Sequence, residues 1–232
     1  MANIKLDIKI KSNFSFLKKI EEFISLISWD SVSKNIDPYR EDYIKDTYKL
    51  DLYDFFTTTE VKSKIVYSFD KENTLTKSES SLVFILSNEN IFRITHYSND
   101  EAFSEINFSN FDTFFFNLYK SIPNGLGYVS WVDVGNYYKF DSKYGLDKFE
   151  FYDSVFNEKP LFYHCVTTEE VYEEDHTKVQ LLNCPFIKVE EWEDGSIEML
   201  HYNNPLDIES DENIEQIRKV RKYLSENNLY SE

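Results

Sequence analysis

The stretch FIKVEEWEDGSIEMLHY, residues 186–202, contains the clearest fold signal of the chain. Its two ends, residues 186–192 and 196–202, have the composition of strands, and Glu193-Asp194-Gly195 stands between them. An Asp-Gly pair supplies the positive-φ residues that a tight turn between antiparallel strands requires. The stretch therefore predicts a β-hairpin.

Periodic patterns on both sides of this hairpin predict helices and more strands. Residues 211–225 place Ile214, Ile217 and Leu224, with Val220 or Arg221, on one face of a helix, and residues 16–27 form a second amphipathic pattern. Residues 4–10 alternate apolar and charged side chains, which is typical of a half-buried strand. Further strands are predicted at residues 61–69, 82–86, 91–97, 128–134, 137–140, 149–152, 161–166 and 179–182.

Other segments are defined by their caps or by interruptions. Residues 29–59, which Asp37-Pro38 interrupts, fit no single period and are predicted as mixed helix and loop. Ser109 is expected to cap a helix whose apolar face lies within residues 111–119, and Thr168 to cap a short acidic helix over residues 169–174.

These elements together predict an α+β fold, in which amphipathic helices pack on one face of antiparallel sheets. A length of 232 residues suits either a single domain over residues 1–232 or two sub-domains divided near residue 105. Asn-Phe-Ser occurs at residues 13–15 and 107–109, before two of the expected helices, and this repeat raises the alternative of two similar halves.

Composition excludes several classes of protein. The chain contains only 5 glycines and no glycine-rich phosphate-binding motif. No apolar run approaches the roughly 20 residues of a membrane helix, and residues 1–11 alternate charge with isoleucine where a signal peptide would be continuously apolar. We therefore expect a cytoplasmic protein that does not associate with membranes.

The net charge of −17 is concentrated in one part of the chain. Residues 1–144 carry 21 acids and 17 bases, whereas residues 145–215 carry 19 acids and 4 bases. Such a segment repels phosphate backbones and attracts basic proteins, so a basic protein partner is expected and direct nucleic-acid binding is not. A solvated surface that only promotes solubility is the simpler alternative.

Candidate catalytic and metal-binding residues form no recognisable motif. His164, Cys165, His176 and Cys184 could supply zinc ligands, but neighbouring strand residues such as His164 and Cys165 point to opposite faces. Glu173 and His176 form one E-x-x-H unit, whereas a di-iron site needs two. A nucleophilic cysteine paired with His96 or His201 remains an alternative. The favoured interpretation is a protein without catalysis, metal or cofactor.

Aromatic residues among acids predict a protein-binding surface, because interfaces combine aromatic anchors with charged rims. Tyr172 and Trp192 are the aromatic candidates, and both could equally be core residues. The candidate partner-binding residues are Glu169, Glu170, Tyr172, Glu173, Glu174, Asp175, Glu190, Glu191, Trp192, Glu193 and Asp194.

An acidic, aromatic-rich α+β chain without catalytic motifs resembles the immunity proteins of bacterial polymorphic-toxin and type VI secretion systems. Val155-Phe156-Asn157-Glu158-Lys159-Pro160 before the strand at residues 161–166, and Asn204-Pro205 before the last helix, are similar to the immunity family numbered fifty-two. The resemblance implies a protein that binds a cognate toxin, often a nuclease, and blocks it without catalysis. An acidic mimic of DNA that inhibits another protein, or a metal-dependent hydrolase, are the alternatives.

Overall fold

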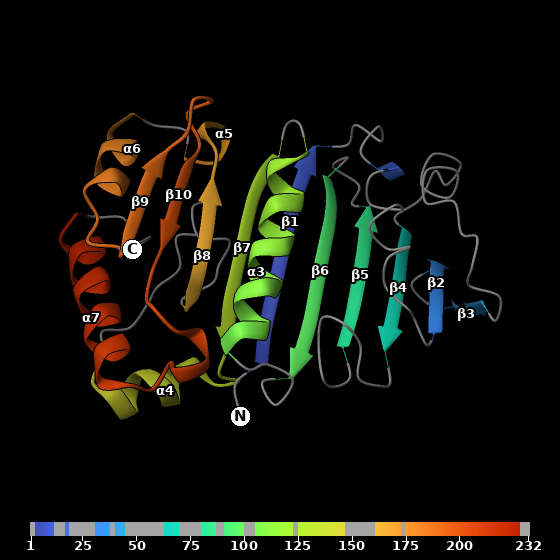
Figure 1. Ribbon diagram of the computed structural model, residues 1–232, viewed down its shortest axis with the longest axis horizontal. Helices are drawn as coiled ribbons and strands as arrows, with labels where there is room; N and C mark the ends of the chain where they lie inside the picture. The colour runs from blue at the N-terminus through green and yellow to red at the C-terminus, as the bar shows by residue number, and fades with distance from the viewer. Residues whose placement is uncertain are drawn as a thin grey trace. The chain divides into compact units, whose positions relative to one another are not determined.

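The structure is a computed structural model (Figure 1) that describes residues 3–11, 17–18, 31–37, 40–44, 63–69, 80–86, 91–99, 105–122, 125–146, 161–172 and 175–227. The chain forms two compact units. Unit 1 comprises Met1–Lys5 and Leu126–Glu232, and unit 2 comprises Leu6–Gly125. The boundary expected near residue 105 lies inside unit 2. The fold class is α+β, as the sequence predicts.

Unit 2 contains an antiparallel sheet and a long helix. Its strands pair in the order β3-β2-β4-β5-β6. The elements are β2 (Ser31–Asp37), β3 (Arg40–Ile44), β4 (Ser63–Phe69), β5 (Ser80–Leu86), β6 (Ile91–Asn99) and α3 (Glu105–Lys120). The strand over residues 61–69 and the hairpin of residues 82–86 and 91–97 are confirmed, with Leu86 opposite Phe92.

Strand β1 (Asn3–Lys11) begins in unit 1 and continues into unit 2. The strand predicted at residues 4–10 is therefore confirmed. Leu6, Ile8 and Ile10 are fully buried, as the alternation predicts, but Asp7 between them is buried too. Of the helix predicted over residues 16–27, only Leu17 and Lys18 are among the described residues, and both are helical.

Two predictions in unit 2 are wrong. Residues 29–59 contain strands β2 and β3, which pair across the Asp37-Pro38 interruption so that Asp37 lies opposite Arg40. Strand β2 also pairs with β4, a partner far along the chain that no local period reveals. Helix α3 begins at Glu105, which places Ser109 inside the helix and not at its cap.

The strands of unit 1 pair antiparallel in the order β7-β8-β10-β9. Its strands are β7 (Gly125–Asp133), β8 (Phe162–Thr167), β9 (Lys188–Glu191) and β10 (Ile197–Leu200). Its helices are α4 (Tyr137–Tyr144), α5 (Glu169–Tyr172), α6 (Asp175–Leu182), the 3-10 turn η4 (Pro205–Asp207) and α7 (Asp211–Glu226). The strands predicted at 128–134 and 161–166 are confirmed, and the strand predicted at 149–152 lies outside the described residues.

One face of the unit 1 sheet packs against α6 and α7. Cross-strand neighbours Val129, Cys165 and Met199 share a buried cluster with Leu181 of α6 and Val220 of α7. A second cluster joins α4 to α7 and includes Phe140, Tyr202, Ile214 and Ile217. No described helix is long and apolar enough to cross a membrane.

Two segments predicted as strands are helices. Residues 137–140 belong to α4, where the Asn136 side chain accepts from the Lys139 amide at 3.0 Å. The rings of Phe140 and Tyr144, one turn apart, contact each other at a tilt of 54°. Residues 179–182 belong to α6, in which Leu181 is fully buried and Val179 is exposed. Both segments are too short for their apolar residues to distinguish a period of two from one of 3.6.

The last helix and the hairpin are confirmed. Helix α7 buries Ile214, Ile217, Leu224 and both Val220 and Arg221, and its N-cap is Ser210, whose hydroxyl accepts from the Asn213 amide. In the hairpin, Gly195 has a φ of 83° and the Asp194 carboxylate accepts from the Ser196 amide at 2.9 Å. The predicted short acidic helix is α5. Thr168 was expected to cap this helix, but its Oγ1 donates to the Leu126 carbonyl at 3.3 Å.

Candidate partner-binding surface

The turn between β9 and β10 lies against helix α5 (Figure 1). The Tyr172 hydroxyl donates to the Gly195 carbonyl at 2.9 Å. A Cβ atom placed on Gly195 would lie 3.6 Å from Glu169 Oε2. The fold therefore brings the acids at residues 169–170 next to those at residues 193–194, although more than twenty positions of sequence separate the two pairs.

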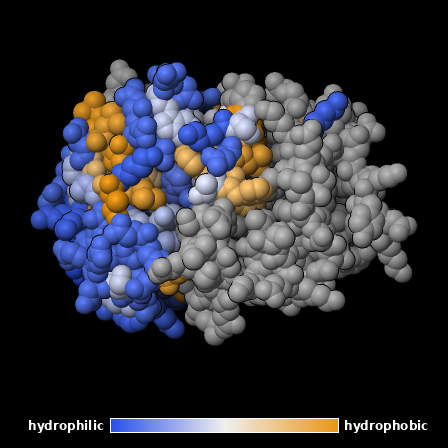
Figure 2. Space-filling view, in the orientation of Figure 1, coloured by the Kyte–Doolittle hydropathy of each residue, from blue (hydrophilic) through white to orange (hydrophobic). Residues whose placement is uncertain are grey.

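We call the exposed acids of α5, β9 and the β9–β10 turn the acidic surface. Its members are Glu169, Glu170, Glu190, Glu191, Glu193 and Asp194, and the side chain of each is exposed. Figure 2 shows predominantly hydrophilic residues at the end of unit 1 where the turn lies. The sequence predicted all six as partner-binding residues, and the structure places them around one hairpin.

Two lysines sit within the acidic surface. Lys178 Nζ lies 2.5 Å from Glu191 Oε1, and Lys188 Nζ lies 3.0 Å from Glu190 Oε2. The hydrogen bond from Lys178 to Glu191 is the main reason that the Lys178 pKa is raised. Both ion pairs are at least partly exposed, so each contributes little to stability.

The two aromatic candidates differ in their surroundings. Tyr172 is 5% exposed and belongs to the buried cluster beneath α6 and α7, so it is a core residue. Trp192 is partly exposed, and its indole Nε1 donates to Glu198 Oε2 at 3.1 Å. Trp192 is therefore a surface aromatic held in a fixed orientation. Glu173, Glu174 and the side chain of Asp175 lie outside the described part of the chain.

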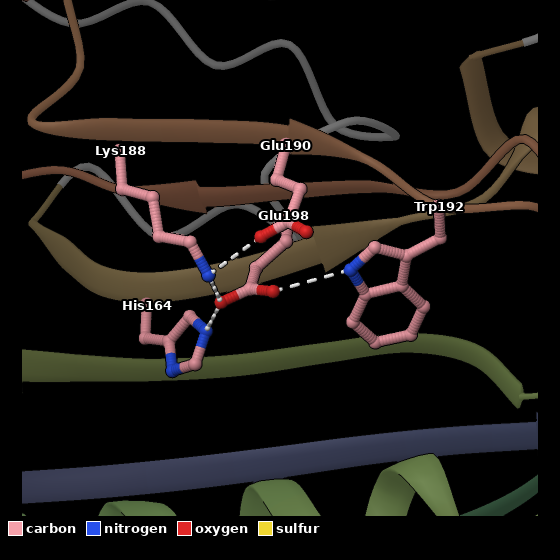
Figure 3. Close-up of polar contacts among 5 residues, drawn as sticks. All are labelled: His164, Lys188, Glu190, Trp192 and Glu198. Carbon is pink, nitrogen blue, oxygen red and sulfur yellow. Dashed lines mark hydrogen bonds and ion pairs between the residues drawn. The ribbon is translucent and has the colours of Figure 1, made fainter.

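Glu198, which no sequence pattern singles out, is the centre of a polar network on β10 (Figure 3). Its Oε1 lies 3.2 Å from His164 Nε2 and 2.7 Å from Lys188 Nζ. Since an ionised carboxylate only accepts hydrogen bonds, Nε2 of His164 carries the proton. The available sequence signal was an acid between Ile197 and Met199 in a predicted strand, on the face opposite theirs.

Burial and pairing act on Glu198 in opposite directions. Desolvation raises the pKa of its carboxyl, whereas hydrogen bonds and charge interactions with His164 and Lys188 lower it, to about 2 overall. Glu198 is therefore ionised at neutral pH although only 5% of it is exposed. A buried carboxylate that is paired in this way holds its donors in place, and the indole of Trp192 is one of them.

The four potential zinc ligands do not share a site. His164 contacts Glu198, while Cys165 and Cys184 belong to the buried cluster on the helix-covered side of the sheet. The His176 side chain is outside the described residues. Among the residues described, no three His, Cys, Asp or Glu side chains are placed to hold a metal ion.

Cys184 and His201 of unit 1 are both buried. Burial raises the pKa of the Cys184 thiol, which keeps it protonated. His201 is fully buried beside Phe162, Phe186 and Tyr202, and its Nδ1 donates to the Phe162 carbonyl at 3.1 Å. Desolvation and the nearby Arg221 charge lower the pKa of His201 to about 3, so it is neutral.

A buried ion pair connects helices α4 and α7. Arg221 Nη1 of α7 lies 2.8 Å from Asp141 Oδ1 of α4, and both side chains are buried. Desolvation raises the Asp141 pKa, and the charge and hydrogen bond of Arg221 oppose that shift. This pair is buried with the packed helices and is not part of the acidic surface.

Comparison with known proteins gives no relative from which to assign a role. No protein-family model matches the chain, and no curated protein matches it.

Proposed function

We propose that this chain is a non-catalytic immunity protein that binds and neutralises a cognate toxin, a basic effector of the nuclease type from a polymorphic-toxin or type VI secretion system. The observation that supports the proposal most directly is the convergence of α5 and the β9–β10 turn, tied together by the hydrogen bond from Tyr172 to Gly195. Two acidic segments thereby form one surface on a folded hairpin.

The chemistry of such a partner follows from the charge. Surface carboxylates attract a basic protein over distances of about 10 Å at moderate salt and speed its association. Nucleases carry basic surfaces because they bind phosphate backbones. An inhibitor of a nuclease therefore gains affinity from the same charges that exclude nucleic acid from its own surface.

A growth assay tests the proposal. Each secreted toxin encoded beside this gene is produced in a bacterial host, alone or with this protein. The wild-type protein should restore growth against one toxin, whereas Glu169→Lys, Glu170→Lys and Glu193→Lys combined should not. If no neighbouring toxin is neutralised by the wild type, the proposal is wrong.

The matched control reverses three acids of helix α7. Asp211 and Glu212 lie in its first turn, as Glu169 and Glu170 do in α5, and Glu215 is exposed. Asp211→Lys, Glu212→Lys and Glu215→Lys change the net charge by the same amount and weaken the same helix-dipole interaction. This control should still restore growth, and equal loss in both triple variants would mean that only net charge matters.

A further inference from the structure

The strand β9 forms one end of the unit 1 sheet. In the strand order, β10 is its neighbour on one side, and no other described strand pairs with β9. The free edge of a strand presents backbone N–H and C=O groups that suit pairing with another extended chain. Proteins use such edges to bind partners by strand addition.

The hydrogen-bond pattern identifies which groups of β9 point outward. The Trp192 amide donates to the Ser196 carbonyl at 2.8 Å, so the Trp192–Ser196 pair is bonded across the hairpin. Bonded and non-bonded pairs alternate along an antiparallel ladder. Glu191 opposite Ile197, and Val189 opposite Met199, therefore direct their backbone groups away from β10.

The side chains around this edge indicate the chemistry of a partner strand. Lys188, Glu190 and Trp192 extend from the same face as Glu198 (Figure 3), and Glu191 lies on the other face. Residues 187–194 contain four acids and one lysine. Apolar contact is available as well, because Ile187 is 42% exposed and Val179 of α6 is 58% exposed, where Figure 2 shows apolar side chains over α6.

We propose that an extended basic segment of a partner protein adds to β9 as a further strand, with Trp192 as the aromatic anchor beside it. The proposal deepens the proposed function and rests on it for the view that the partner is a basic toxin. A second copy of this chain fits less well, since two copies of the same net negative segment would lie side by side.

The protein variant that tests the edge is Glu191→Pro, with Glu191→Ala as its control. Proline removes the outward N–H but leaves the bonds of β9 to β10, and both variants lose the ion pair with Lys178. The probe is a fluorescent eight-residue peptide of alternating lysine and valine, titrated at low salt. We expect Glu191→Pro to weaken binding of the peptide about tenfold, because one backbone hydrogen bond is lost. Glu191→Ala should weaken it less than about threefold.

Two N-methylated peptides provide a test that leaves the protein unchanged. One peptide carries a methyl group on the backbone nitrogen of every lysine, and the other on the backbone nitrogen of every valine. In a docked strand one set of amides faces β9 and the other faces solvent, so one peptide should lose binding and the other should keep it. Equal binding of both peptides, or equal loss in both, would overturn the proposal even if Glu191→Pro fails to fold.

The same variants separate this proposal from the proposed function. If a toxin is neutralised equally by wild type, Glu191→Pro and Glu191→Ala, the immunity function stands and strand addition is wrong. If the N-methyl pattern appears but no toxin is neutralised, strand addition stands and the immunity function is wrong. A dimer that Glu191→Pro dissociates, measured by light scattering, would show that the edge binds a second copy and would also overturn the proposal.

Discussion

The carboxylate of Glu198 is stable inside the protein because donors surround it. His164 and Lys188 contact Oε1 while Trp192 donates to Oε2, so both oxygens have partners. If the charge of this carboxylate is removed, its buried donors lose their acceptor. The resulting loss of folding free energy exceeds the net stabilisation that the original hydrogen bonds provided. Glu198 is thus a positioning residue for Trp192.

Replacement of Glu198 by Gln should lower the free energy of unfolding by about 1–3 kcal/mol at pH 7.

The folded pKa of Glu198, about 2, is below the ordinary 4.5, so the unfolded chain binds the proton first as the pH falls. The stability from this group is present above pH 4.5 and disappears towards pH 2, by about 3 kcal/mol in total. Urea unfolding at pH 7, 4.5 and 3 measures both effects. Glu190→Gln, an exposed control, should change little, and an equal pH dependence in Glu198→Gln and wild type would contradict the assignment.

His201 gives a separate pH dependence at higher pH. Its folded pKa of about 3 lies below the ordinary 6.5, so in this window the unfolded chain binds a proton that the folded chain does not. Stability should therefore fall as the pH drops from 6.5 towards 3, by up to about 1.4 kcal/mol per pH unit. His201→Asn keeps a donor for the Phe162 carbonyl and should flatten the curve between pH 7 and 5. Parallel curves for wild type and variant would exclude His201 as the cause.

At the scale of the element, one hydroxyl ties α5 to the hairpin. Tyr172→Phe removes the bond to Gly195 and should lower stability by about 1 kcal/mol. Tyr223→Phe is the control, since its hydroxyl donates to the Gln180 carbonyl at 3.0 Å and joins α7 to α6. Hydrogen exchange at Gly195, whose amide donates to the Trp192 carbonyl, should accelerate only in Tyr172→Phe. Unchanged exchange in that variant would mean that α5 does not hold the turn.

Elements with a strong local signal were predictable from the sequence, and elements fixed by distant partners were not. The Asp-Gly turn specified the hairpin, and the spacing of Ile214, Ile217 and Leu224 specified α7. Strand β2 depends on β3 and β4 for its hydrogen bonds. The four apolar residues of α4 and the three of α6 are too few to determine a period. The exposed acids of the candidate site were predictable from composition. The Glu198 network was not, because it depends on the strand register that places His164 diagonally across from Glu198.

For the whole molecule, the net charge of −17 predicts how stability responds to salt. Repulsion among carboxylates destabilises a compact state and is screened within about 10 Å at 0.1 M salt. Raising NaCl from about 10 to 150 mM should therefore increase the melting temperature by about 2–4 °C, which corresponds to about 1 kcal/mol for a chain of this size.

The distribution of charge makes that prediction specific to the acidic surface. The triple reversal at Glu169, Glu170 and Glu193 and the triple reversal at Asp211, Glu212 and Glu215 each change the net charge from −17 to −11, because every acid-to-lysine change adds two charges. If repulsion is concentrated where α5 meets the β9–β10 turn, only the first reversal should flatten the dependence of melting temperature on salt. Calorimetric scans across a salt series measure this. Equal flattening in both would mean that the repulsion is spread over the molecule, and the acids gathered beside β9 would then have no special electrostatic role in the unbound protein.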